Sequence, residues 1–126
     1  MFTFSRSERL KSRKTIGLLF RDGQSYMAYP LRVVWLPVPA EVAARMDTAV
    51  QIAISVPKRS FKTAVARNRI KRLIREAYRL NKHLLYEKLA GSEQRYALML
   101  MYIAKEELPL EEILSGVKKM VKKFAP

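Results

Sequence analysis

The sequence predicts a single α+β domain built of two layers, a β-sheet and the helices that pack on it. Segments rich in β-branched residues alternate with segments whose apolar residues have helical spacing, and proline or glycine separates many of them. The chain has 126 residues, of which 49% are hydrophobic, so it can bury one core of ordinary size. We therefore treat residues 1–126 as one domain and expect residues 1–8 to be flexible.

The first half of the chain contains one predicted helix and two predicted strands. Ser12 suits the N-cap of a helix that runs to about Asp22, and Gly23 ends it. Leu31–Leu36 is rich in β-branched and aromatic residues and predicts a strand, which the prolines after it terminate. Ala49–Val56 alternates between apolar and polar residues, a pattern that predicts a half-buried strand.

The second half contains a long basic helix, a strand and a final helix. Ala97–Ile103 is a continuous apolar run, which predicts a strand buried on both faces. Pro109 begins the last helix, and Ala40–Thr48 is left without an assigned structure. We expect Ile54 and Leu98 to be buried. In the long basic helix the apolar residues share one sector, which comprises Ile70, Leu73, Ile74, Ala77, Tyr78 and Leu80.

The charge balance points to a polyanionic partner. The chain has 25 Lys and Arg against 11 Asp and Glu, a net charge of +14. Such an excess on a small domain opposes compaction, and a nucleic acid explains it most simply, with an anionic membrane surface as the second possibility. The absence of cysteine excludes disulfides, thiolate metal sites and a cysteine nucleophile. His83 is the only histidine, so a zinc site built from several histidines is also excluded.

Positive charge is concentrated in Lys58–Arg79, where the only acidic residue is Glu76. Like charges four residues apart destabilise an isolated helix by roughly 0.2–0.5 kcal/mol per pair, so a helix kept for structure alone would gain by including acids. Arginine also binds phosphate bidentately. We therefore predict a phosphate-binding helix; the alternative is a solvated basic surface. The cations of this segment are Lys58, Arg59, Lys62, Arg67, Arg69, Lys71, Arg72, Arg75 and Arg79.

Aromatic residues lie among cations in the first third of the chain. This combination suits single-stranded nucleic acid, whose unpaired bases stack on aromatic rings for about 1–3 kcal/mol each. The alternative is that these rings are core residues, and for Phe20 both interpretations stay open. Trp35 can face either side of its strand. The aromatic residues are Phe20, Tyr26, Tyr29 and Trp35, and the cations near them are Arg6, Arg9, Lys11, Arg13, Lys14 and Arg21.

No catalytic or metal-binding pattern is found. Glu106 and Glu107 are adjacent, as are Glu111 and Glu112, and adjacent side chains diverge on a helix. The longest apolar run, Ala97–Ala104, is shorter than the roughly 20 residues of a membrane helix. We therefore expect a cytoplasmic protein that binds RNA or DNA, with no catalytic residue, no metal ligand and no membrane partner.

Ala64–Ala77, with the sequence AVARNRIKRLIREA, closely resembles the Arg-Asn-Arg signature of the protein subunit of bacterial ribonuclease P. Ile54–Arg59 is similar to the strand of that family that ends in a basic pair. Arg9-Leu10-Lys11, followed by Phe20 and Gly23, is similar to the family's first helix. The resemblance extends to about Ile103.

The resemblance implies a fold and a function. The family has a four-stranded sheet with helices in the order αβββαβα. Its protein is non-catalytic: a catalytic RNA with Mg²⁺ acts as the endoribonuclease and removes the 5′ leader of precursor tRNA. The resemblance thus implies two RNA partners, the catalytic RNA and precursor tRNA, no obligate protein partner, and Mg²⁺ held through the RNA rather than by the protein.

Residue by residue, the resemblance implies two binding regions. The basic helix and the pair before it would contact the catalytic RNA through Lys58, Arg59, Arg67, Asn68, Arg69, Lys71, Arg72 and Arg75. A cleft for the single-stranded leader would be lined by Ile16, Phe20, Val34 and Trp35. Ile16 stands where the family often has a second aromatic residue, and Ser60–Thr63 lacks the family's frequent glycine, so Phe61 either packs inside or faces RNA.

The alternative function is that of a basic ribosomal or RNA-chaperone protein, which would bind structured RNA by charge and have no role in cleavage.

Overall fold

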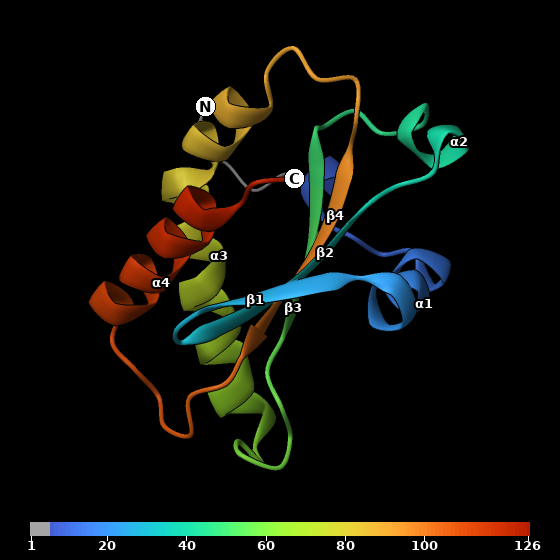
Figure 1. Ribbon diagram of the computed structural model, residues 1–126. Coiled ribbons are helices and arrows are strands. Elements are labelled where there is room, and N and C mark those ends of the chain that lie inside the picture. Colours follow the sequence, from blue (N-terminus) through green and yellow to red (C-terminus); the bar gives the residue numbers. More distant parts are fainter. Residues whose placement is uncertain (1–5) are drawn as a thin grey trace.

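A computed structural model describes residues 6–126 and contains a four-stranded sheet with helices on both faces (Figure 1). Helices α3 (Ala64–Leu89) and α4 (Leu110–Lys123) lie on one face, and α1 (Arg13–Asp22) lies on the other. The α+β prediction is confirmed, and α1 adds a partial third layer. The other elements are η1 (Arg6–Glu8), β1 (Gln24–Ala28), β2 (Leu31–Pro37), α2 (Ala40–Ala43), β3 (Val50–Ser55) and β4 (Tyr96–Tyr102).

The sheet is mixed, with the strand order β1-β2-β4-β3. β2 pairs antiparallel with both β1 and β4, whereas β3 runs parallel to β4 and is joined to it through α3. The four strands implied by the family resemblance are confirmed. The residue pattern alone does not predict β1, because Gln24 and Ser25 are polar and the strand is only five residues long.

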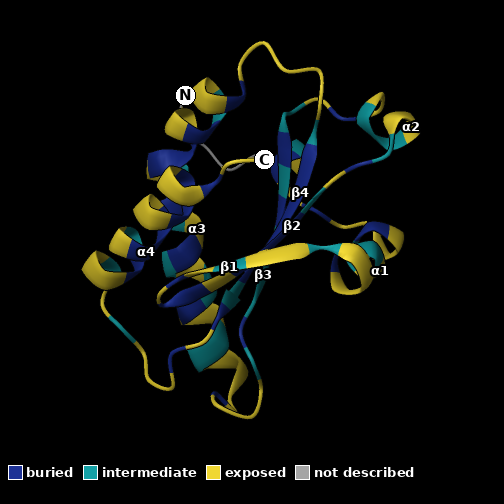
Figure 2. Cartoon of the chain, viewed as in Figure 1, coloured by how far each residue is buried: buried dark blue, intermediate teal, exposed yellow. Residues whose placement is uncertain are grey.

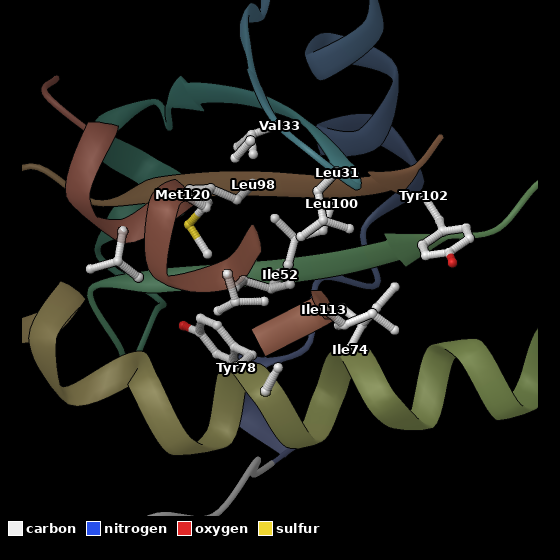
Figure 3. Close-up of a cluster of buried hydrophobic side chains, with 14 of the residues drawn as sticks. Leu31, Val33, Ile52, Ile74, Tyr78, Leu98, Leu100, Tyr102, Ile113 and Met120 are labelled. Carbon is white, nitrogen blue, oxygen red and sulfur yellow. The ribbon is translucent and has the colours of Figure 1, made fainter. Parts of the chain in front are cut away.

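The main core lies between the sheet and helices α3 and α4 (Figure 2). Leu31 and Val33 of β2 meet Leu98 and Leu100 of β4 in this layer, all four fully buried, and Figure 3 shows them facing the side chains of the helices. The predicted burial of Leu98 is therefore confirmed. Trp35 continues the alternation of β2 into the same layer.

A smaller apolar cluster lies on the opposite face, beneath α1. Leu19 is buried there with Val34 and Met99. The helix begins at Ser12, whose Oγ accepts a hydrogen bond from the Thr15 backbone N–H at 3.2 Å, as predicted. It ends at Gly23, where a Cβ would lie 2.3 Å from the Leu19 carbonyl oxygen and 2.8 Å from a methyl of Val34. Glycine at this position therefore lets α1 turn into β1 while staying in contact with the sheet.

Several expectations need correction. Leu80, which shares the apolar sector of the basic helix, is 38% exposed, and Ile54 is only half-buried because it lies where β3 lines a surface depression beside Arg75. The apolar pattern in the sequence ends at Leu80, whereas α3 continues to Leu89. The second half of the helix buries the polar residues Asn81 and Lys82, which an apolar pattern does not include. Of the residues expected to be flexible, 1–5 lie outside the described part, whereas Arg6–Glu8 form a 3₁₀ turn in which Glu8 is buried.

Candidate nucleic-acid interface

α3 and the loop before it present an exposed basic surface, which we call the cationic face. Thr63 begins the helix by accepting a hydrogen bond from the Ala66 backbone N–H, at 3.2 Å. The buried side of its first turns is formed by Ile70 and Ile74, so Arg69, Arg72 and Arg75 project outward. The cationic face comprises Lys58, Arg59, Asn68, Arg69, Lys71, Arg72 and Arg75, all exposed except the half-buried Lys71.

Arg67 was predicted to belong to this surface, but it also holds the loop that precedes the helix. Its Nη1 donates to the carbonyl oxygen of Phe61 at 2.8 Å. Phe61 itself is buried, with its ring centroid 5.7 Å from that of Tyr102. The ring of Phe61 thus anchors the loop in the core, and Arg67 fixes the carbonyl beside it. Together they set the position of Lys58 and Arg59 relative to the helix.

Arg69 is held by an acidic partner. Its Nε and Nη2 donate to the two carboxylate oxygens of Glu107, each at 3.0 Å. The hydrogen bonds from Arg69 lower the pKa of Glu107, so the pair is charged at neutral pH. Both side chains are exposed, and such surface pairs contribute little to stability. A phosphate can therefore replace the carboxylate at little cost, using the same bidentate geometry.

Arg72 and Arg75 have no acidic partner among residues 6–126. They lie one turn apart, at i and i+3, and both are exposed. No carboxylate of residues 6–126 forms an ion pair that would offset the repulsion between the two guanidinium groups. An exposed pair of this kind binds an anion more readily than arginines that are already neutralised.

A groove lies on the opposite side of the sheet, between α1 and the uncovered part of the strands. Phe20 stands at its rim with 62% of its surface exposed, so the interpretation of this ring as a core residue is wrong. Val34 and Met101 form an apolar floor, and Arg32 adds a cation. The groove measures about 260 Å³ and combines an exposed ring, an apolar base and a positive charge. We call it the sheet groove.

Two of the four residues predicted to line this groove do not do so. Trp35 is 9% exposed and packs edge-on against Phe124, the residue that follows α4, 5.2 Å between ring centroids, on the far side of the sheet. The prediction for Trp35 is wrong because alternation along β2 sends Val34 and Trp35 to opposite faces. Ile16 is half-buried against the smaller core cluster.

Arg32 and Met101 were not predicted to line the sheet groove. The signal for Arg32 was present: it is the one charged residue in a strand of apolar ones, and it shares a face with Val34. Met101 could not be recognised in this way, because the strand that carries it is apolar throughout.

A second hollow is lined by residues of both surfaces. It measures about 590 Å³ and lies where β3 and β4 end, with Ser55 and Met101 at its base. Arg59 of the cationic face and Lys105 are among its lining residues. Met101 also lines the sheet groove, so the two depressions are neighbours on the end of β4.

The acidic residues do not gather into a site. Glu111 and Glu112 occupy the first turn of α4, where the helix dipole favours them. Within residues 6–126, no group of three or more histidine or carboxylate side chains is placed to hold a metal ion. In the same part of the chain, no helix combines the length and the apolar character needed to cross a membrane.

Two solved structures that share this fold are RNase P proteins. The protein from Thermotoga maritima superposes with a TM-score of 0.71 at 21% identity, covering 94% of this chain and 99% of its own. The Staphylococcus aureus protein gives a TM-score of 0.69 at 20% identity, over 91% of this chain and 93% of its own. At these identities the likeness establishes the fold.

The sequence establishes the family. The family model described as Ribonuclease P matches residues 4–125. A ribonuclease P protein component from Porphyromonas gingivalis is 44% identical over 108 residues, which are 86% of this chain and 75% of the relative. Another, from Chlorobaculum tepidum, is 32% identical over 93% of this chain and 79% of its own length. With a matching fold, a match over nearly the whole sequence and a cationic helix that carries the signature residues, this chain belongs to the family of ribonuclease P protein components.

Proposed function

We propose that this protein is the non-catalytic subunit of an RNA-based endoribonuclease that removes the 5′ leader of precursor tRNA. In this proposal the cationic face binds the catalytic RNA and the sheet groove binds the leader. The observation that carries the proposal is the separation of two different chemistries. Exposed arginines of a helix lie on one surface, and an exposed ring over an apolar floor lies on the other.

The two surfaces suit two different RNA structures. Folded RNA presents phosphates at its surface, and the guanidinium groups of Arg69 and Arg72 can bind them bidentately. An unpaired strand exposes its bases, which can stack on Phe20 and contact Val34 while a phosphate meets Arg32. The sheet groove and the hollow beside Arg59 share the lining residue Met101, and this proximity supports simultaneous binding of both RNAs.

Hydrolysis itself is assigned to the catalytic RNA and its Mg²⁺. The residues that the fold gathers here are arginines and lysines, whose charged side chains donate hydrogen bonds and have no acceptor for a proton. Their contribution is to hold the leader and to lower the repulsion between RNA phosphates. A protein that neutralises phosphates reduces the concentration of Mg²⁺ that the folded RNA needs. We expect this assembly to act in the cytoplasm without an obligate protein partner.

Reconstitution tests the proposal. The protein is added to its cognate catalytic RNA at low Mg²⁺, and release of the leader from precursor tRNA is measured. We expect strong stimulation by the wild-type protein. Arg69→Ala/Arg72→Ala should lower the slope of log affinity for the catalytic RNA against log salt concentration by about 1.4–1.8, since each lost phosphate contact removes about 0.7–0.9.

The matched control is Lys118→Ala/Lys122→Ala, which removes the same charge from exposed positions on α4. It should leave both stimulation and slope close to wild type. Equal stimulation by an unrelated basic protein would instead favour the general RNA-binding alternative.

A further inference from the structure

The residues before α1 form a strap across the open edge of the sheet. Arg9 forms a parallel bridge with Ile52 of β3, and the Leu10 backbone N–H donates to the Ile52 carbonyl oxygen at 2.9 Å. The Gln51 side chain donates to the carbonyl oxygen of Ser7 at 3.1 Å. Residues 6–11, which we call the strap, therefore extend the sheet beyond its edge strand.

The strap is anchored on both faces of the sheet. On the side of α3, Glu8 is 3% exposed and accepts hydrogen bonds from the Nζ of Lys82, itself 6% exposed, at 2.8 and 2.9 Å. The hydroxyl of Tyr86 also donates to this carboxylate. Two residues further on, Leu10 is buried on the side of α1, in the same cluster as Leu19. The strap thus passes from one face to the other around β3.

The buried ion pair determines where the strap lies. A buried carboxylate must be matched by its partners, because an uncompensated charge in the interior is strongly unfavourable. Glu8 finds these partners, Lys82 and Tyr86, on one side of a long helix, one turn apart. A shift of the strap along β3 would separate all three. The pair therefore holds the strap in one register.

This register brings three cations from distant parts of the sequence to one groove. Arg9 and Lys11 of the strap and Arg75 of α3 line a depression of about 200 Å³ beside β3. Its other lining residues are Leu10 and the β3 residues 52–54, and none of them is acidic. Arg75 belongs to the cationic face, so the strap extends that surface around the edge of the sheet toward α1.

We infer that this edge groove, lined by Arg9, Lys11 and Arg75, binds the phosphodiester backbone of RNA, and that Glu8 and Lys82 act as positioning residues for it. The inference rests on the proposed function and adds a third contact surface between the other two. Three convergent cations and no acid favour an anion, and the depression's length along three residues of a strand suits an extended backbone. The phosphates come either from the catalytic RNA or from the precursor tRNA.

Two binding measurements distinguish these sources. Arg9→Ala/Lys11→Ala is compared with wild type for affinity to the catalytic RNA alone, and for affinity of the assembled holoenzyme to precursors with leaders of increasing length. We expect the log–log salt slope to fall by about 1.4–1.8 in one of these measurements. The control Lys118→Ala/Lys122→Ala removes equal charge and should not change the slope. An unchanged slope in both measurements, with a folded Arg9→Ala/Lys11→Ala variant, would overturn the inference.

A double-mutant cycle tests the positioning role. Glu8→Gln removes the charge of the anchor while keeping its size, and it should lower the salt slope as far as Arg9→Ala/Lys11→Ala does. Combining the two changes should cause no further loss, because both act through the same contacts. A merely structural role would give additive losses and would lower the affinity for every RNA alike. Should Glu8→Gln fail to fold, the exchanged pair Glu8→Lys/Lys82→Glu restores a buried ion pair and is expected to recover the slope.

The outcomes separate this inference from the proposed function. If Arg69→Ala/Arg72→Ala lowers the slope and Arg9→Ala/Lys11→Ala does not, only the edge groove is refuted. If neither variant changes binding of any RNA, the proposed function fails as well.

Discussion

Replacing Phe20 with alanine should weaken leader binding without weakening the fold. The ring is 62% exposed at the rim of the sheet groove, so its removal opens no cavity in the core. Stacking of one base on an aromatic ring is worth about 1–3 kcal/mol, which corresponds to roughly a 5- to 150-fold loss of affinity. The loss should appear only when the leader is long enough to place a nucleotide beside the ring.

The assay measures affinity of the holoenzyme for a series of precursors that differ only in leader length. Mature tRNA, which has no leader, should bind the Phe20→Ala holoenzyme as well as wild type. Tyr29→Ala provides the matched control, because Tyr29 is 57% exposed but lies in the turn between β1 and β2, against α4. That variant should bind every leader normally. Leu19→Ala, at the buried neighbour of Phe20, should lower the melting temperature instead.

Two results would refute this reasoning. If Phe20→Ala lowered the melting temperature and weakened all RNAs by the same factor, the ring would be a structural residue. If its loss of affinity did not depend on leader length, the sheet groove would not be the site of the leader. The Tyr29→Ala control excludes a general effect of removing an exposed ring.

Three further results are expected. Leu98→Ala should lower the free energy of unfolding by about 2–5 kcal/mol in urea titrations, since Leu98 is fully buried, and a near-neutral change would contradict its place in the core. Arg67→Ala should reduce both RNA affinity and melting temperature, because Arg67 also donates a hydrogen bond to the Phe61 carbonyl oxygen. An unchanged melting temperature would mean that Arg67 acts only as a surface cation. Burial raises the pKa of the tyrosines, so the folded state holds their protons more tightly than the unfolded chain. The stabilisation is complete below about pH 10, the unfolded value, and is lost as pH rises above it. Melting temperature should therefore fall above pH 10, and the phenolate absorbance of the four tyrosines named below should rise with unfolding; ionisation of these four in a chain with native circular dichroism would contradict this. The tyrosines concerned are Tyr26, Tyr78, Tyr86 and Tyr102.

The fold was predictable where local pattern and tertiary environment agree. Ser12 as a helix cap, the strand after Tyr29 and the strand that contains Leu98 each follow from the sequence alone. β1 did not, because a short strand with polar residues is stabilised by its pairing with β2 rather than by its own composition. The apolar sector recognised in the sequence ends at Leu80, before the end of α3 at Leu89, for a related reason. Its second half buries Asn81 and Lys82, and a pattern of apolar residues cannot reveal polar side chains whose partners lie elsewhere in the chain.

The cationic face was predictable because both its charge and its helical spacing are local properties. The sheet groove was only partly predictable, since it depends on which face of β2 each residue occupies. The sequence of β2 indicates which residues share a face. The charged Arg32 requires an uncovered face, and alternation along the strand then places Trp35 on the covered face. Phe20 required the structure, because helical spacing allows it to share the buried side with Leu19 or to lie at its edge.

The strap shows what no local pattern could reveal. Glu8 and Lys82 are 74 residues apart, and each is an ordinary charged residue in its own segment. Their pairing depends on the strand order β1-β2-β4-β3, which puts β3 at the edge of the sheet. A bare edge strand would expose unpaired backbone groups, and the strap supplies partners for some of them. The same six residues therefore protect the edge strand, connect the two layers of helices and carry Arg9 and Lys11 to Arg75. If the edge groove binds RNA, the register set by one buried ion pair links the stability of this domain to its affinity for phosphate.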